Sequence, residues 1–339
     1  MSSLNCNAPL LRLMLCTILL ASFFPTRCMA NKPVIEATAH LTTPFSIPRS
    51  HTVQINDEAR TYRLYVKLPK GYKSSANKDI NYPVIYLTDA MYTFQIMSGV
   101  TRFPMNSKQM TPAIIVGISW ELGLRSDHSR VRDYTPTVDA SWEKVTGGAD
   151  RHLHFFKSKI IPYIEQNYRT DPAQRTYVGN SLGGLFGAYI LLKQPDLFTN
   201  YLIGSPSFWW HERWFLTQFA KNIASLNKID ANVFIGIGAL EHNGEDGDSQ
   251  YNMVADAQHF KALLNNLEIS SPAFSSKLLI IDEAHHATAF ATTAIHGMDW
   301  LFNTKQGRML QSSIDTADSK KLKSSQQLTP KSPITTEKF

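Results

Sequence analysis

The stretch Gly179-Asn180-Ser181-Leu182-Gly183 has the residue types and the spacing for nucleophilic chemistry. Its G-x-S-x-G pattern is typical of a nucleophile elbow, a sharp turn between a strand and a helix that exposes the serine hydroxyl. An apolar run, Thr176-Tyr177-Val178, precedes the motif, and closely spaced apolar residues follow it from Leu185 to Leu192. Glycines flank the serine because a Cβ would clash in such a turn. The pattern predicts that Ser181 is a hydrolase nucleophile, with a structural Gly-Ser turn as the alternative.

A serine nucleophile needs a base that takes its proton, and an acid that orients the base. In α/β-hydrolases these residues occur in the chain order Ser, Asp or Glu, His. Two adjacent histidines, His285 and His286, follow a predicted strand at Leu278-Leu279-Ile280-Ile281. Adjacent side chains point in different directions, so only one histidine can face Ser181. Both remain candidates on this reasoning.

The predicted acid is Glu241, which follows the apolar strand predicted from Val233 to Gly238 and has the required place in the chain order. The alternative is that Glu241 is a solvated loop carboxylate. Other carboxylates near these positions are Asp246, Asp248, Asp282 and Glu283.

An oxyanion hole is expected from two backbone N–H groups. One is the N–H of Leu182, directly after the nucleophile, and the other comes from the turn after an early strand. The early strand predicted from Val84 to Leu87 ends at Thr88-Asp89-Ala90-Met91, so Ala90 and Met91 are both candidates for the second donor.

No metal or other cofactor is expected for this chemistry. The pairs Glu241-His242 and His285-His286 lack the helical spacing of metal-binding histidines, and adjacent histidines rarely converge on one ion. Trp209 and Trp210 follow a predicted strand, where aromatic side chains wall a substrate pocket or cap a core. We treat both tryptophans as candidate pocket residues.

The first thirty residues have the features of a signal peptide. Arg12 precedes an apolar segment from Leu13 to Phe24, and Cys28-Met29-Ala30 fits a cleavage site. The apolar segment is short for a transmembrane helix, so no stable membrane insertion is expected after cleavage, and an uncleaved N-terminal anchor is the alternative. This predicts a periplasmic or secreted protein. All three cysteines lie in the segment 1–30, so no disulfide or thiolate site is expected downstream.

The net charge of +6 comes from the ends of the chain. The segment 1–30 contributes two arginines and the segment 304–339 a net charge of +4, so residues 31–303 carry none. A neutral body argues against nucleic-acid binding, which needs a basic face. The segment 304–339 is rich in Ser, Lys, Thr and Gln and is predicted to be a disordered tail. The sequence does not indicate an oligomeric state.

The order of elements predicts one α/β domain over 31–303. Two alternating segments, Thr52 to Ile55 and Thr61 to Lys67, are typical of antiparallel edge strands. Short apolar runs then alternate with helical patterns, of which the longest is predicted from Ala149 to Tyr168. This alternation predicts a doubly wound, mostly parallel sheet with helices on both faces. Ligands bind such sheets beyond the carboxyl ends of the strands, where all the candidate residues lie.

The chain resembles the "putative esterase" family of α/β-hydrolases, in the branch with bacterial enterochelin-type siderophore esterases. The resemblance runs from about Arg60 to Phe302. Its matching stretches include Arg132-Asp133-Tyr134-Thr135-Pro136-Thr137, Ser205-Pro206-Ser207-Phe208-Trp209-Trp210 and His286-Ala287-Thr288-Ala289-Phe290, together with the elbow.

The resemblance implies a serine esterase that acts on a small-molecule ester, with Ser181 as nucleophile and His286, not His285, as base. The family has Asp-Gly where this chain has Asp89-Ala90. A siderophore substrate would favour arginines near the pocket, for which Arg130 is a candidate together with Arg125 and Arg132, with surface charge or ion pairs as the alternative. Two other functions are weighed against ester hydrolysis: acyl transfer on the same fold, and a catalytically silent binding module.

Overall fold

The computed structural model of the chain describes residues 44–226, 229–242 and 251–302. Contacts group the chain into two units, Met1–Phe45 and Ser46–Phe339, and every described helix and strand belongs to the second unit. The predicted signal peptide and the predicted tail lie outside the described residues. None of the described helices is long and apolar enough to cross a membrane.

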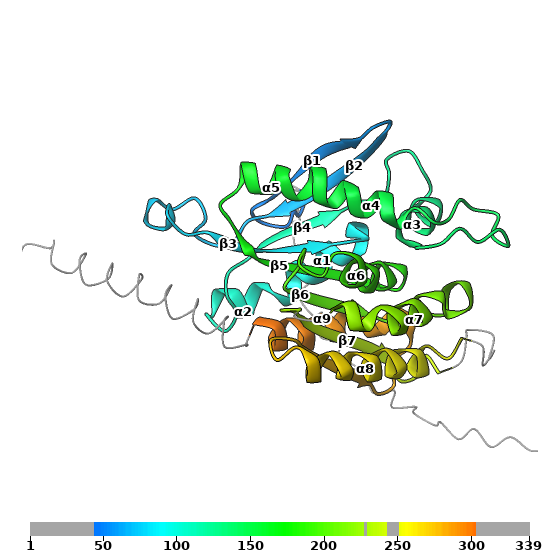
Figure 1. Cartoon of the computed structure of the whole chain (residues 1–339). Coiled ribbons are helices and arrows are strands. Elements are labelled where there is room, and N and C mark those ends of the chain that lie inside the picture. Colours follow the sequence, from blue (N-terminus) through cyan, green and yellow to red (C-terminus); the bar gives the residue numbers. More distant parts are fainter. Residues whose placement is uncertain (1–43, 227–228, 243–250, 303–339) are drawn as a thin grey trace, which may run out of the picture. The chain divides into compact units, whose positions relative to one another are not determined.

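A single sheet of eight described strands forms the centre of the second unit (Figure 1). The strands are β1 (Ser50–Asp57), β2 (Arg60–Lys67), β3 (Tyr82–Leu87), β4 (Ile114–Ile118), β5 (Thr170–Asn180), β6 (Asn200–Gly204), β7 (Asn232–Gly238) and β8 (Ser275–Ile281). Their order across the sheet is β1-β2-β4-β3-β5-β6-β7-β8. The β1–β2 and β2–β4 pairs are antiparallel, and all pairs from β4 to β8 are parallel. This confirms the predicted mostly parallel sheet with antiparallel edge strands.

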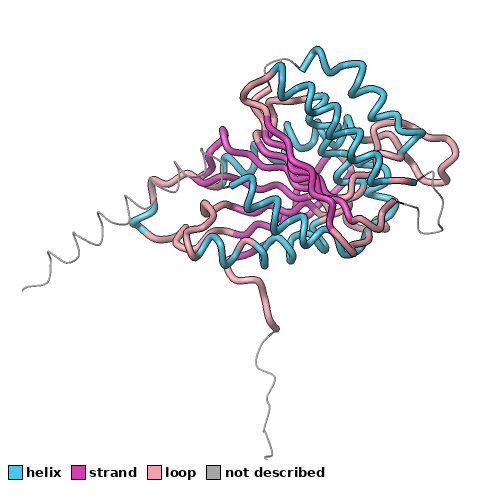
Figure 2. Tube along the Cα trace, turned by 90° about the horizontal axis from the view of Figure 1, so that it is seen from below, coloured by secondary structure: helices cyan, strands magenta, loops and turns pink. Residues whose placement is uncertain are grey.

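Helices cover both faces of the sheet, and Figure 2 shows the strands between two helical layers. The described helices are α1 (Ala90–Val100), α2 (Arg102–Asn106), α3 (Ser126–Tyr134), α4 (Ala149–Phe155), α5 (Ile161–Asn167), α6 (Leu182–Lys193), α7 (Trp210–Asn222), α8 (Met253–Ser270) and α9 (His286–Phe302). Helices α1 and α9 pack on one face, and α3 to α8 pack on the other.

The alternation of side chains along the strands builds two separate cores. In β5, Tyr177 packs against the layer of α3 to α8, and Val178 packs against α1 and α9. In β6, Tyr201 and Leu202 divide in the same way. Successive residues of a strand point to opposite faces, so a strand with helices on both faces must be apolar throughout. This explains the continuous apolar runs in the sequence.

The helix predicted from Ala149 to Tyr168 is interrupted. Helix α4 passes into a π-helical turn over Phe156–Ile160, and α5 begins at Ile161. Pro162 lies at the start of α5 and has no N–H for a bond to an earlier carbonyl. A proline also clashes with the carbonyl four residues before it, and the wider π turn relieves that clash.

Candidate active site

The register of the parallel strands brings the ends of four of them to one edge of the sheet. Asn180 of β5 pairs with Gly204 of β6, and Gly204 pairs with Gly236 of β7. Gly238, at the end of β7, pairs with Ile281 of β8. The residues that follow these strands therefore meet at the carboxyl edge, on the right of Figure 1. Ser181, Glu241 and His286 all follow strands that end at this edge.

Ser181 occupies a strained turn between β5 and α6. Its backbone angles are φ 61° and ψ −121°, a conformation that non-glycine residues rarely adopt. A Cβ on Gly179 would lie 2.2 Å from the carbonyl oxygen of Gly183, so the turn closes only with glycine at that position. The Ser181 N–H donates to the carbonyl of Gly204 at 2.9 Å, which ties the turn to the neighbouring strand.

Glu241 and His286 form a short hydrogen bond at this edge. The distance from His286 Nδ1 to Glu241 Oε2 is 2.6 Å. The carboxylate is buried with 4% of its residue surface exposed, and the histidine side chain is 37% exposed. A buried carboxylate bonded to Nδ1 sets the tautomer and the direction of the ring, and leaves Nε2 free for proton transfer.

Two further groups fix the Glu241 carboxylate. Its Oε1 accepts hydrogen bonds from Ser205 Oγ at 2.7 Å and from the Gly238 N–H at 2.8 Å. Ser205 is fully buried and has a positive φ of 35°, and its N–H donates to the carbonyl of Gly236 at 2.7 Å. Ser205 therefore orients the Glu241 carboxylate. The sequence patterns do not point to Ser205, although the residue lies in the Ser-Pro-Ser stretch after β6.

Ser207, in the same stretch, contacts Ser181. Its Oγ lies 3.2 Å from Ser181 Oγ, and its N–H donates to the Ser181 carbonyl at 3.1 Å. Among the described contacts, no hydrogen bond joins Ser181 to His286. Catalytic hydrogen bonds are often long before substrate binds, so this geometry does not count against His286.

The other candidate base and acids make different contacts. His285 is exposed, and its Nδ1 accepts from the Ala287 N–H at 3.3 Å, at the start of α9. Asp282 and Glu283 are both exposed, and neither makes a described contact with His286. Asp246 and Asp248 lie outside the described residues.

The candidate oxyanion donors lie at two helix starts. Leu182 is the first residue of α6, and Ala90 and Met91 are the first two residues of α1. N–H groups in a first helical turn have no partner within the helix, so they are available to an oxyanion. Asp89, before α1, takes the left-handed conformation with φ 54°.

The residue after Asp89 is alanine here, and the fold accommodates its methyl group. Ala90 is buried, and its Cβ would lie 2.8 Å from a Cβ added to Gly117 of β4. The missing side chain at Gly117 thus makes room for Ala90. Because Asp89 takes the left-handed conformation and Ala90 has no positive φ, glycine is not needed after the aspartate.

The Asp89 carboxylate also forms an ion pair with Arg130 and accepts its hydrogen bonds. Arg130 donates to its two carboxylate oxygens at 3.2 and 3.0 Å, and Trp120 Nε1 donates to Oδ1 at 2.5 Å. The Asp89 side chain is fully buried and the Arg130 side chain is 21% exposed. This bidentate pair holds the turn that carries Ala90 and Met91.

The other two candidate arginines are also held by carboxylates. Arg125 is exposed and pairs with Asp127, and Arg132 is buried and pairs with Asp133 and Glu121. Surface or buried ion pairing, the alternative weighed from the sequence, describes the contacts of these arginines.

An open groove of about 500 Å³ includes Trp209, which lies two residues after Ser207 in the chain. It is lined by Asp139, Ser141, Trp142, Trp209, His211, Glu212, Arg213 and Tyr251. The rings of Trp142 and Trp209 stack with centroids 6.4 Å apart. Trp210, in contrast, is buried behind the groove, where its indole N–H donates to Thr137 Oγ1 at 3.0 Å. The groove contains one of the two candidate tryptophans.

Three consecutive residues at the groove adopt left-handed backbone angles. The φ angles of His211, Glu212 and Arg213 are 45°, 54° and 60°. Each such residue costs about 1–2 kcal/mol. Two contacts hold the turn: His211 Nδ1 lies 2.8 Å from Thr137 Oγ1, and Arg213 Nε donates to Asp256 Oδ1 at 2.6 Å.

In the described part of the chain, no three His, Cys, Asp or Glu side chains are grouped to hold a metal ion.

Comparison with known proteins places this chain in a family. Residues 56–271 match the family model described as "Putative esterase". Ferri-bacillibactin esterase BesA of Bacillus subtilis is 32% identical over 216 residues, which cover 59% of this chain and 73% of that protein. The siderophore triacetylfusarinine C esterase of Aspergillus fumigatus is 27% identical over 191 residues, 55% of this chain and 65% of that protein.

Solved structures show the same fold. The BES protein from Bacillus cereus superposes with a TM-score of 0.66 at 27% identity, covering 77% of this chain and 98% of that one. The siderophore hydrolase EstA from Aspergillus nidulans also gives 0.66, at 20% identity, covering 79% and 100%. This chain belongs to the "Putative esterase" family of α/β-hydrolases and is a carboxylic ester hydrolase.

Proposed function

We propose that the chain hydrolyses esters through an acyl-enzyme, with Ser181 as nucleophile, His286 as general base and acid, and Glu241 as the residue that orients His286. The observation that carries the proposal is the 2.6 Å bond from His286 Nδ1 to the buried Glu241 carboxylate, at the sheet edge where Ser181 occupies its strained turn.

In the first half of the reaction, Ser181 Oγ attacks the ester carbonyl carbon while His286 Nε2 takes the hydroxyl proton. The carbonyl oxygen becomes an oxyanion, which the N–H groups of Leu182 and of Ala90 or Met91 stabilise. The intermediate collapses, the C–O bond to the alcohol breaks, and His286 returns the proton to the leaving oxygen. In the second half, water attacks the acyl-enzyme by the same route and releases the acid.

We propose a siderophore ester as the substrate. The two curated relatives described above are named ferri-bacillibactin esterase and siderophore triacetylfusarinine C esterase. The groove lined by Trp209 and Trp142 offers ring surfaces, and small-molecule sites are lined mainly by hydrophobic and aromatic side chains. Trp209 is the proposed pocket residue, with Trp210 supporting it from behind.

The proposed location is the periplasm or the cell exterior. It rests on the signal-like pattern over 1–30, with one hydrolase domain over 31–303 and a basic tail over 304–339. An uncleaved N-terminal anchor would also expose the enzyme outside the cytoplasm. Sequencing the amino terminus of the exported protein would distinguish the two arrangements.

The catalytic proposal is tested with short-chain p-nitrophenyl esters and a fluorophosphonate probe. We expect Ser181→Ala to lose turnover and labelling. Ser207→Ala is the matched control, because its hydroxyl lies 3.2 Å from that of Ser181 and yet should leave labelling intact. Labelling that persists in Ser181→Ala, or maps to Ser207, would refute the assignment. Mass spectrometry of the products, with added alcohols, separates hydrolysis from acyl transfer.

The substrate proposal needs a separate measurement. Ferric and iron-free forms of bacillibactin and triacetylfusarinine C would be incubated with the enzyme, and their hydrolysis followed by mass spectrometry. We expect cleavage of at least one siderophore with a kcat/KM well above that of p-nitrophenyl esters. Efficient turnover of simple esters with no siderophore cleavage would reject the substrate class while leaving the mechanism intact.

A further inference from the structure

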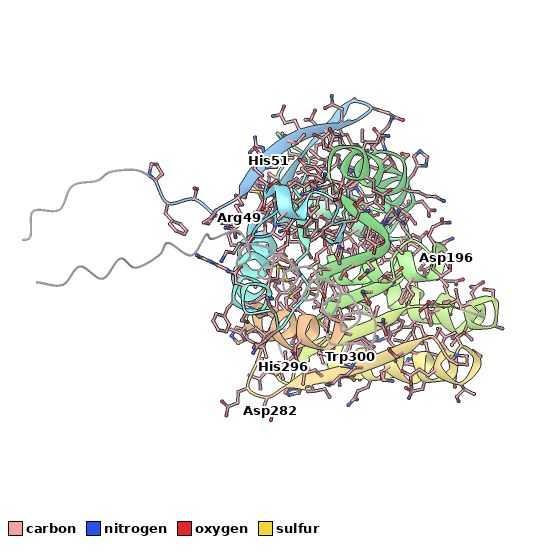
Figure 3. The ribbon with its side chains drawn as sticks, turned by 90° about the vertical axis from the view of Figure 1, so that its left-hand side faces the viewer. Arg49, His51, Asp196, Asp282, His296 and Trp300 are labelled. Atoms are coloured by element: carbon pink, nitrogen blue, oxygen red, sulfur yellow. The ribbon has the colours of Figure 1, made fainter. Side chains whose placement is uncertain are left out.

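The opposite edge of the sheet carries an unusual group of positive charges. Lys67, the last residue of β2, pairs with Ile115 near the start of β4, which puts it at the amino-terminal edge of the parallel strands. Figure 3 views the molecule from this side, with Arg49 labelled near the base of β1. One small pocket there is lined by Arg49, Lys67, Lys70 and Arg102, together with six uncharged residues. We call these four side chains the cation cluster.

Lys67 is the buried member of the cation cluster. Only 5% of its surface is exposed, and its Nζ donates to the Ser98 carbonyl at 2.9 Å, near the end of α1. A carbonyl near a helix C-terminus is a favourable partner for a cation. An ammonium group has three N–H donors, however, and this bond uses one of them. The Ser98 hydroxyl is also buried and has no hydrogen-bond partner.

Arg49 is held beside Lys67 at a cost in backbone energy. Its φ is 62°, in the left-handed region that a non-glycine residue rarely adopts. Its carbonyl accepts from the Leu68 N–H at 3.0 Å, and its Nε donates to the Leu68 carbonyl at 3.3 Å. These bonds fix the guanidinium close to the Lys67 ammonium despite their like charges.

The described residues supply no counter-charge. No Asp or Glu lines the pocket, and no described carboxylate forms an ion pair with any member of the cation cluster. Burial, together with the charges of Arg49 and Arg102, lowers the pKa of Lys67 to about 8. Clustered cations without a carboxylate repel one another, and a bound anion removes that repulsion.

We infer that the cation cluster binds an oxyanion, a phosphate group, at the edge of the sheet opposite the active site. The pocket offers about 10 Å³ of space, about enough for a single small atom group. One phosphate oxygen would reach Lys67 there, and the outer oxygens would accept from Arg49 and Arg102. A neighbouring groove of about 460 Å³ shares Arg49 and Leu68 with the pocket and leaves room for a larger molecule that carries the phosphate.

The phosphate group has two sources, free inorganic phosphate and a lipid headgroup, and the experiment separates them. Full-length protein would be titrated with inorganic phosphate by calorimetry, with chloride at matched ionic strength as the reference. In parallel, it would be sedimented with phosphatidylglycerol vesicles and with phosphatidylcholine vesicles. We expect phosphate-specific binding, or sedimentation with the anionic vesicles alone, depending on the source.

The double variant Arg49→Gln/Arg102→Gln tests the site, since both side chains are exposed and their loss should leave the fold intact. We expect binding to weaken at least about tenfold. Lys159→Gln, which removes an exposed charge from another segment, is the control and should bind normally. Absence of both phosphate and vesicle binding, or equal binding by the double variant and the wild type, would overturn the inference. Ester hydrolysis by the double variant should match the wild type.

Discussion

The two ends of the parallel sheet differ in whether their charged side chains have partners of opposite charge. At the carboxyl edge, the buried carboxylates have cationic or basic partners: Glu241 contacts His286, and Asp89 contacts Arg130. At the amino edge, the described part of the chain gathers the cation cluster around Lys67 without a carboxylate. Paired charges hold catalytic groups in a fixed geometry before substrate arrives. Unpaired cations instead favour an external anion, so the two ends suit different ligands.

The largest loss of activity is expected from a change at Glu241, on the carboxyl edge. We expect Glu241→Gln to lower kcat by about 10⁴-fold, because an amide nitrogen facing Nδ1 stabilises the wrong tautomer of His286. The amide oxygen can still accept from Ser205 and Gly238, so the fold should persist. The measurement is ester turnover, with circular dichroism to check folding. The exposed Glu283→Gln is the control, and an active Glu241→Gln enzyme would reject Glu241 as the orienting acid.

The second test removes the carboxylate at the oxyanion turn. Asp89→Asn leaves the Arg130 guanidinium partly buried without its counter-charge, which we expect to cost about 3 kcal/mol in free energy of unfolding. Urea denaturation of Asp89→Asn, Arg130→Gln and the double variant measures the coupling. We expect the double variant to be less destabilised than the sum of the single changes. Additive effects would mean that the pair is not a unit.

The third test concerns Lys67, whose contribution to stability should increase when its charge is lost. The pKa of Lys67 is about 8 in the folded protein, against an ordinary value of 10.5. Between these pH values the unfolded chain binds more protons, so the contribution of Lys67 to stability rises with pH. In chloride buffer, we expect the stability of the wild type relative to Lys67→Met to rise by on the order of 2 kcal/mol from pH 7 to pH 10.

Phosphate sharpens this third prediction. A bound phosphate group favours protonated Lys67, so the rise in relative stability with pH should shrink in phosphate buffer. Urea denaturation of both proteins in the two buffers measures the difference. A pH profile that is identical for wild type and Lys67→Met would show that Lys67 keeps its ordinary pKa and is not buried among unpaired charges.

The smallest expected effect is at Ser205. Ser205→Ala removes one of the two donors to Glu241 Oε1, and a lost hydrogen bond to a charged group is worth about 1.5–3 kcal/mol. We expect kcat to fall about tenfold or more with KM little changed, because Ser205 acts through Glu241 and not on the substrate. Ser205→Cys, which keeps the size and a weaker S–H donor at this buried position with positive φ, should restore part of the rate. A fall in kcat together with a comparable rise in KM in both variants would indicate a general disturbance of the site.

Local patterns in the sequence predict much of this protein. The elbow around Ser181 and the apolar strands are features of short stretches, and the predicted roles of Glu241 and His286 rest on their place in the chain order. The apolar pattern of a strand and the glycines of an elbow depend on residues that are close in sequence. Both can therefore be recognised without knowing the fold. The interrupted helix shows the limit of such patterns: the apolar spacing from Ala149 to Tyr168 is continuous, but Pro162 forces a π turn.

The partners of the site residues were decided by the tertiary structure. The register of β6, β7 and β8 brings Ser205 and the end of β7 beside His286, and no local pattern specifies that register. Asp89 and Arg130 are far apart in sequence, as are Arg49 and Arg102, and their meeting depends on how α1, α2 and α3 pack on the sheet. The sequence determines which side chains carry charge. Which charges pair depends on the distances between them, and only the folded chain sets those distances.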